Sequence, residues 1–264
     1  MDRLDYRSLL DLGGRTFAVM GAGQGIGEQA CHALSQAGAN VVCIDNNRGR
    51  AETIASDVRG HAVVADVTSR EEMARAIADT VKMAGPLSGI VDIVGEANTQ
   101  TLSDFDDAQW ARQHDIVLRH VFLTLQIGAD AIAEAGGGSI TFVGSIAGNA
   151  SIPGQSVYGS AKAALHQMVR TMSYELAPKN IRVNAVAPGI VRTPRLLSRL
   201  TAGQWAQVER VIPLGRAARP FEIASALLFL ASDMASHVTG HILAADGGLA
   251  AITPLPPFAM PQPE

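Results

Sequence analysis

The chain has 264 residues, of which 47% are hydrophobic, and a formal net charge of −4. This length suffices for one sizeable α/β domain or two small ones, and the composition disfavours a disordered chain. Because 25 acidic residues outnumber 21 basic ones, no electrostatic argument favours nucleic acid or an anionic membrane as a partner. Residues 1–7 carry charges where a signal peptide needs an apolar run, and no apolar window is long enough for a membrane span. We therefore expect a soluble, cytoplasmic protein.

Apolar runs alternate with helix-length periodic segments along the chain. The runs that suit buried parallel strands are 16–20, 40–44, 62–65, 89–94, 139–143, 181–186 and 242–245. The clearest helical segments between them are 25–37, 69–83, 108–134, 157–177 and 220–231. This alternation is typical of an α/β doubly wound (Rossmann) fold, in which a seven-stranded parallel sheet has helices on both faces. We expect one domain over residues 1–252 and an extended, proline-rich tail over residues 253–264.

The two cysteines, Cys31 and Cys43, lie inside apolar stretches and show no metal-ligand spacing. They are expected to be reduced, buried thiols. No metal site is predicted.

A glycine-rich loop follows the first predicted strand and opens the first predicted helix. Glycines let the backbone approach a pyrophosphate, which the unpaired amides and positive dipole end of the helix then hold. A glycine cluster alone is equally typical of an ordinary tight turn, but the strand before it and the helix after it favour dinucleotide binding. The residues expected to contact the cofactor here are Gly21, Gly23, Gln24, Gly25, Ile26 and Gly27.

Asp45 ends the second predicted strand, where an acid can bind an adenosine ribose. Its carboxylate would accept hydrogen bonds from the ribose hydroxyls and repel a 2′-phosphate, so NAD is favoured over NADP. Arg48 keeps NADP open, because a guanidinium can bind that phosphate. Asp66 and Val67 close the third strand; Asp66 is read equally well as a helix cap and as a residue beside the adenine.

Tyr158 and Lys162 are spaced by one turn at the start of the helix after the fifth strand, so both lie on one helix face. A nearby lysine is expected to lower the phenol pKa from about 10, which makes Tyr158 a proton donor or acceptor suited to alcohol and ketone chemistry. Ser145 ends the fifth strand and is placed to hydrogen-bond the same substrate oxygen. Each residue alone is also typical of a solvated helix edge or a turn; their combination with a dinucleotide loop is specific.

These motifs, in this order, resemble the classical short-chain dehydrogenases/reductases over about residues 12–249. The resemblance implies that Ser145, Tyr158 and Lys162 are catalytic and that Lys162 also grips the nicotinamide ribose. It implies hydride transfer between NAD and a small-molecule secondary alcohol or ketone. The further cofactor contacts that it implies are Gly95, Tyr158, Lys162, Pro188, Gly189, Ile190 and Thr193.

The resemblance also implies a homotetramer, in which helices 108–134 and 157–177 pack across a two-fold axis. These helices carry more apolar positions than one core-facing stripe needs. The positions in question are Leu118, Val121, Leu125, Leu165, Met168 and Met172.

The sequence departs from the family at two places. Residues 92–95 read Asp-Ile-Val-Gly where the family has Asn-Asn-Ala-Gly, so a brace of the central strands must be replaced. Val117 stands where the family has a helix asparagine that holds a water between the lysine and solvent, and an isopropyl group cannot carry a hydrogen bond. Either His114, Asp115, His120 or a backbone carbonyl with water completes the proton path, or proton exchange is slow. We expect His120 to be an exposed or interface histidine rather than a relay.

Residues 194–219 are expected to form a lid over the substrate. Its apolar residues, which favour an apolar or cyclic alcohol but would also suit simple helix packing, are Leu196, Leu197, Leu200, Trp205, Val208, Val211 and Ile212. Arg195 and Arg199 leave open a clamp on a substrate carboxylate. A catalytically weakened nucleotide-binding scaffold protein of the same fold remains the alternative. An S-adenosylmethionine methyltransferase would not require Tyr158 and Lys162 at this spacing.

Overall fold

The computed structural model describes residues 5–251, so the predicted tail 253–264 lies outside the described residues. Within this range the apolar runs form one seven-stranded sheet with the order β3-β2-β1-β4-β5-β6-β7. All neighbouring strands pair in parallel, which confirms the predicted fold class. The strands are β1 Thr16–Met20, β2 Asn40–Asp45, β3 His61–Val64, β4 Leu87–Asp92, β5 Gly138–Val143, β6 Ile181–Pro188 and β7 Ile242–Ala245.

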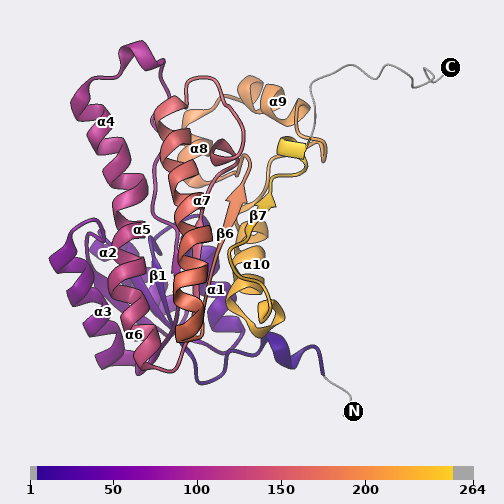
Figure 1. Ribbon diagram of the computed structural model, residues 1–264. Coiled ribbons are helices and arrows are strands. Elements are labelled where there is room, and N and C mark those ends of the chain that lie inside the picture. Colours follow the sequence, from indigo (N-terminus) through magenta and orange to yellow (C-terminus); the bar gives the residue numbers. More distant parts are fainter. Residues whose placement is uncertain (1–4, 252–264) are drawn as a thin grey trace.

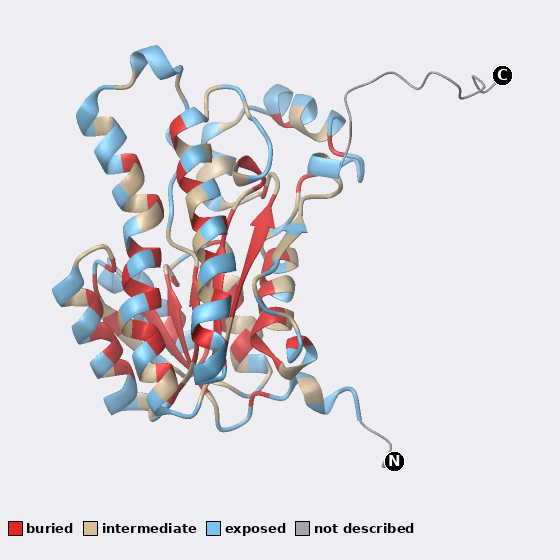
Figure 2. Cartoon of the chain, viewed as in Figure 1, coloured by how far each residue is buried: buried red, intermediate tan, exposed pale blue. Residues whose placement is uncertain are grey.

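Helices cover both faces of this sheet (Figure 1). They are α1 Ile26–Gln36, α2 Arg48–Asp57, α3 Arg70–Ala84, α4 Asp107–His114, α5 His120–Leu123, α6 Ala129–Glu134, α7 Ser156–Leu176, α8 Pro194–Arg199, α9 Ala202–Arg210 and α10 Pro220–Ala231. One core lies between the sheet and α3, α5, α6 and α7, and the other lies between the sheet and α1, α2 and α10. The five inner strands are mostly buried, the edge strands β3 and β7 are only partly buried, and the helices alternate buried and exposed residues (Figure 2). Burial on both faces explains why the strands read as continuous apolar runs.

The predicted strand 89–94 overlaps β4, but its bounds are shifted by two residues, because β4 begins at Leu87 and ends at Asp92. Asp92 pairs with Met20, the last residue of β1, so the sheet has no strand residue left against which Val94 could pair. An apolar run shows that residues are buried, but it does not show where pairing ends.

The predicted helix 108–134 is one continuous stretch with two π-helical turns, Asp115–Arg119 and Thr124–Gly128. By length and composition the stretch Asp107–Glu134 passes for a membrane span, contrary to the expectation drawn from the sequence. However, half of its apolar window is buried inside the fold, as in a core helix.

The helix positions cited for a subunit interface are only partly available to a partner. Val121, Leu125 and Leu165 are 4% exposed or less and belong to the chain's own core. The large apolar side chains that these two helices do expose are Trp110, Phe122 and Tyr174.

Cys31 and Cys43 are both buried and unbridged, as expected. The fold brings their sulfur atoms to 3.6 Å from each other, and burial raises the pKa of the Cys31 thiol well above its usual value.

Candidate active site

The glycine loop is packed so closely against the start of α1 that a side chain cannot be accommodated at Gly27. A Cβ on Gly27 would lie 1.9 Å from the Gly21 carbonyl oxygen. Gly25, the residue before α1, has φ +63°, a conformation that favours glycine. No side chain hydrogen-bonds the first-turn amides of α1 from this position. The loop therefore presents backbone donors and a positive helix end, the arrangement that binds phosphate.

The Asp45 carboxylate lies directly on this loop. Its Oδ2 accepts a hydrogen bond from the Gly23 N–H at 2.9 Å, and its Oδ1 accepts one from the Asn47 N–H at 2.9 Å. Arg48 is directed to Glu52, to which it donates at 3.2 Å. Arg50, which the sequence reasoning did not consider, lies closer to the loop, because a Cβ on Gly23 would be 2.5 Å from the Arg50 Cβ.

Asp66 forms a turn rather than the cap of α3. Its Oδ1 accepts from both the backbone N–H and the hydroxyl of Thr68, at 2.9 and 2.7 Å. The cap is Ser69, whose side chain accepts from the Glu72 N–H. Val67 is 5% exposed and belongs to the core, so among the described contacts this pair is not joined to the glycine loop.

The segment after β6 returns to the glycine loop. A Cβ on Gly25 would lie 3.5 Å from the Thr193 side chain, which also caps α8. Gly189 lies against Asp246, where a Cβ would approach the Asp246 Cα to 3.0 Å. Pro188 is the last residue of β6, and the Ile190 carbonyl accepts from the Ala218 N–H at 2.9 Å. This predicted cofactor segment is therefore held beside the loop by backbone contacts.

Ser145, Tyr158 and Lys162 meet at the carboxyl edge of the sheet. Ser145 follows β5, and the other two lie one turn apart on α7. The Lys162 Nζ donates to the Val143 carbonyl at 2.7 Å and lies 5.9 Å from the centre of the Tyr158 ring. A Cβ on Gly95 would be 3.3 Å from the same Nζ. The structure thus brings together the three candidate catalytic residues and the one family glycine kept after β4.

The electrostatics of this group differ from the expectation in one respect. Burial raises the pKa of Tyr158, although the neighbouring Ser145 hydroxyl opposes the shift. The expected lowering of the Tyr158 pKa is wrong, because burial of the phenol is the dominant effect; the Lys162 ammonium donates its hydrogen bond to the Val143 carbonyl. Burial lowers the pKa of Lys162 from 10.5 to about 8, and the charge of Asp92 opposes this shift.

His166 lies behind Ser145, and the sequence reasoning missed it. Its ring is 1% exposed, and burial, together with nearby cations, lowers its pKa to about 4. In the neutral ring, Nε2 accepts from the Ser145 N–H at 3.5 Å, so Nδ1 carries the proton and donates to Asn149 Oδ1 at 3.0 Å. The spacing of four residues between Lys162 and His166 places both on one helix face, and this spacing could have indicated that His166 lies near the site.

His120 contacts both positions at which the sequence departs from the family, Asp92 and Val117. His120 is 1% exposed, so the expectation of an exposed or interface histidine is wrong. Its two ring nitrogens lie 2.8 Å from Asp92 Oδ2 and 3.1 Å from the Val117 carbonyl oxygen. His114 has a different described partner, since its Nδ1 lies 3.0 Å from the Trp110 carbonyl oxygen.

The segment 194–219 folds on a small core of its own, near the end of the sheet to which the strands point (Figure 1). Most of the apolar residues predicted to cover a substrate pack there against one another, whereas Leu197 and Val211 are 49% and 56% exposed. Arg195 and Arg199 both approach one Glu96 carboxylate oxygen, Arg195 in direct contact and Arg199 at 3.7 Å. A carboxylate of the chain itself therefore occupies the predicted clamp.

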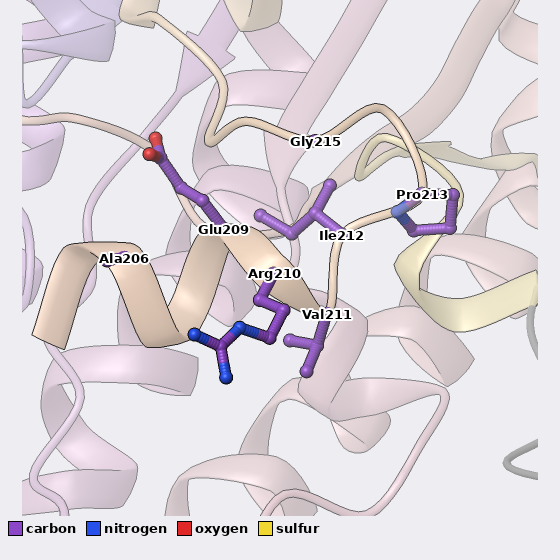
Figure 3. A pocket seen from close by; sticks show the side chains of 7 residues that line it. All are labelled: Ala206, Glu209, Arg210, Val211, Ile212, Pro213 and Gly215. Atoms are coloured by element: carbon purple, nitrogen blue, oxygen red, sulfur yellow. The ribbon is translucent and has the colours of Figure 1, made fainter.

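A hollow of about 710 Å³ lies on α9 and the turn after it (Figure 3). It is lined by Ala206, Glu209, Arg210, Val211, Ile212, Pro213 and Gly215. None of these is a predicted catalytic or cofactor-binding residue, so this hollow is separate from the group around Tyr158.

Known proteins resemble this chain along nearly its whole length. A family model described as enoyl-(acyl carrier protein) reductase matches residues 21–250. Galactitol 2-dehydrogenase (L-tagatose-forming) of Cereibacter sphaeroides is 37% identical over 255 residues, which cover 93% of this chain and 98% of that protein. Cis-4-hydroxycyclohexanecarboxylate dehydrogenase of Sinomonas cyclohexanicum is 38% identical over 244 residues, with coverages of 90% and 97%.

Solved structures agree with these relatives. A 7α-hydroxysteroid dehydrogenase complexed with NADH and 7-oxo glycochenodeoxycholic acid superposes with a TM-score of 0.89 at 31% identity, covering 93% of this chain and 98% of that one. The resemblance noted from the motifs is thus confirmed by both sequence and structure. The chain belongs to the short-chain dehydrogenase/reductase family, whose members are oxidoreductases that bind a nicotinamide cofactor on a Rossmann fold.

Proposed function

We propose that the protein is an NAD(H)-dependent oxidoreductase that interconverts a secondary alcohol and a ketone on an apolar or cyclic substrate. The observation that carries this proposal is the group of Ser145, Tyr158 and Lys162 at the carboxyl edge of the sheet, beside Gly95. In open α/β sheets, ligands bind at this edge. The catalytic roles of the three residues are part of the proposal.

The residues at the glycine loop fit a dinucleotide. The close packing at Gly21 and Gly27 leaves backbone amides, rather than side chains, to meet a pyrophosphate. We assign the remaining contacts to Gly23, Gln24, Gly25, Ile26, Asp45, Asp66, Val67, Gly95, Pro188, Gly189, Ile190 and Thr193, besides Tyr158 and Lys162. When bound, NAD supplies the hydride acceptor, and NADH the donor, for the reacting carbon.

Asp45 supports NAD over NADP. Its carboxylate lies on the Gly23 amide, where it would repel a 2′-phosphate. Arg48, the sequence argument for NADP, is paired with Glu52, although Arg50 lies close to the loop and its charge competes with this preference.

Side chains of the protein would carry out the proton transfer. Because burial raises its pKa, Tyr158 is protonated at neutral pH and can donate its proton to a carbonyl oxygen in the reductive direction. Ser145 would hydrogen-bond the same oxygen. Lys162, with a pKa of about 8, is an ammonium at pH 7, and we assign it to hold the nicotinamide ribose of the bound cofactor.

The apolar or cyclic substrate is proposed from the relatives and the lid. One relative is named for a hydroxycyclohexanecarboxylate and a structural neighbour for a hydroxysteroid. The apolar core of segment 194–219 is compatible with such a substrate, as noted above. A galactitol dehydrogenase among the relatives makes a polyol the next class to test.

The test is a spectrophotometric assay of reduced cofactor, run with NAD and NADP against alicyclic, steroidal, aromatic and polyol alcohols. Tyr158→Phe should lower kcat by at least about 100-fold while NAD affinity stays within about twofold. Tyr6→Phe is the control, because Tyr6 lies outside the candidate site and is 70% exposed. Near-normal turnover by Tyr158→Phe would refute the role of the phenol. Cofactor binding without turnover across the panel would favour the scaffold alternative.

We also propose that the protein is cytoplasmic and assembles as a homotetramer through the helices of residues 107–134 and α7. The exposed Trp110, Phe122 and Tyr174 side chains on these helices support an interface there. Light scattering should give four times the chain mass at micromolar concentration, and a monomer would contradict the proposal.

A further inference from the structure

A fully buried polar cluster lies between β4 and the helical stretch that packs on α7. Asp92, His120 and Thr124 are each 1% exposed or less. His120 Nδ1 lies 2.8 Å from Asp92 Oδ2, and the Thr124 hydroxyl donates to the same oxygen at 3.0 Å. Burying a carboxylate costs several kcal/mol unless it is paired, so three polar side chains in this place need an explanation beyond packing.

Both ring nitrogens of His120 face oxygen acceptors. Nδ1 faces the Asp92 carboxylate and Nε2 lies 3.1 Å from the Val117 carbonyl oxygen. The Val117 carbonyl oxygen can only accept, so Nε2 carries a proton, and one further proton is shared between Nδ1 and Asp92 Oδ2. His120 therefore bridges Asp92 and the Val117 carbonyl.

This pair holds two segments that lie against the Lys162 helix. On one side, Val117 belongs to the π-helical turn Asp115–Arg119, which packs on α7, and π turns are frequent at functional sites. On the other side, Asp92 Oδ1 accepts from the Val94 N–H at 3.2 Å. That contact fixes the turn leading to Gly95, which lies against the Lys162 Nζ. Asp92 is also the charge that opposes the effect of burial on the pKa of Lys162.

We propose that His120 is a positioning residue for Lys162. By bridging Asp92 and the Val117 carbonyl, it fixes the π-helical turn and the turn at Gly95, and it takes the structural place of the polar helix side chain that Val117 lacks. The proposal rests on the proposed function, because it assigns Lys162 to the reaction. Among the described contacts, Asp92 on β4 is the charged group next to the ring.

The first test needs neither cofactor nor activity. In ¹⁵N-histidine NMR spectra of the cofactor-free protein at pH 7, His120 is expected to carry a proton on Nε2, assigned by comparison with His120→Gln. A ring with a bare Nε2 would overturn the proposed bridge.

The second test compares His120→Gln with His114→Gln. Glutamine keeps one donor but cannot reach both oxygens, so kcat should fall about ten- to a hundredfold, because small errors in position are costly in catalysis. The KM for NAD should stay within about twofold. The kcat of His114→Gln should be unchanged, because the described hydrogen bond of that side chain goes to the Trp110 carbonyl and not to the Asp92 cluster.

The double variant Asp92→Asn/His120→Gln guards against misfolding, because it replaces both members of the buried pair with neutral amides. It is expected to fold like the wild type and to retain the loss in kcat. A wild-type kcat in His120→Gln, or in the double variant, would overturn the proposal. Absence of turnover in the wild type and in His114→Gln alike would instead refute the proposed function.

Discussion

The buried Lys162 side chain is expected to make the free energy of unfolding rise with pH. Its side chain is 2% exposed, and burial lowers its pKa from 10.5 to about 8. A shift of this size corresponds to about 3 kcal/mol against the charged form in the folded state. Below pH 8 both states hold the proton, and the folded state bears the whole penalty. Between pH 8 and 10.5 the unfolded chain keeps a proton that the folded chain has lost, so the free energy of unfolding rises with pH.

Replacing Lys162 with Met removes this dependence while keeping an unbranched side chain. From pH 7 to pH 9.5 the lysine should add about 2 kcal/mol to the free energy of unfolding, since about 1.5 pH units lie above its pKa. The variant also loses the hydrogen bond to the Val143 carbonyl, which costs about 1 kcal/mol at both pH values and leaves the pH dependence unchanged.

Urea unfolding at a fixed protein concentration measures this effect. The wild type should gain about 2 kcal/mol relative to Lys162→Met between pH 7 and pH 9.5. Lys179→Met is the control, because Lys179 is exposed and paired with Asp130; its difference from the wild type should stay constant. An equal wild-type gain over both variants would refute the reasoning about the buried ammonium.

Three further predictions concern other residues. Thr141→Val should raise the free energy of unfolding by about 1 kcal/mol in urea, because the buried Thr141 Oγ1 has no hydrogen-bond partner among the described residues; a destabilised variant would contradict this. Gly27→Ala should weaken NAD binding at least about tenfold by calorimetry, because its Cβ would lie 1.9 Å from the Gly21 carbonyl oxygen. An unchanged affinity for NAD would contradict the assignment of the glycine loop to cofactor binding. The Arg216 hydrogen bonds hold the pKa of Glu222 at about 2, so this pair stabilises the fold above pH 4.5, and its contribution is lost as pH falls toward 2. Glu222→Gln should therefore lower the melting temperature at pH 7 more than at pH 3, and equal losses would argue against the ion pair.

The fold was predictable mainly because its five inner strands are mostly buried on both faces. Each of the seven apolar runs overlaps a strand of the sheet, since burial on two faces leaves a continuous apolar signal. Helix α2 carries little of this signal, because it buries only Ala51, Ile54 and Ala55. The Asn47 side chain that caps it was the local cue.

The site was predictable where its residues lie close in sequence and unpredictable where the fold joins distant segments. Tyr158 and Lys162 are one helical turn apart, so their proximity follows from helix geometry. The partners of His120 lie on β4 and in a π-helical turn, and sequence periodicity does not reveal a π turn. The direction of the Tyr158 pKa shift also depends on burial, which spacing alone does not give.

Transfer of a label from substrate to cofactor tests the redox assignment most directly. The best alcohol from the panel, deuterated at the carbinol carbon, should pass its deuterium to NAD in one step, so mass spectrometry finds one deuterium per NADH formed and none in Tyr158→Phe. Product formation with all of the deuterium in water, and none in the cofactor, would contradict the account.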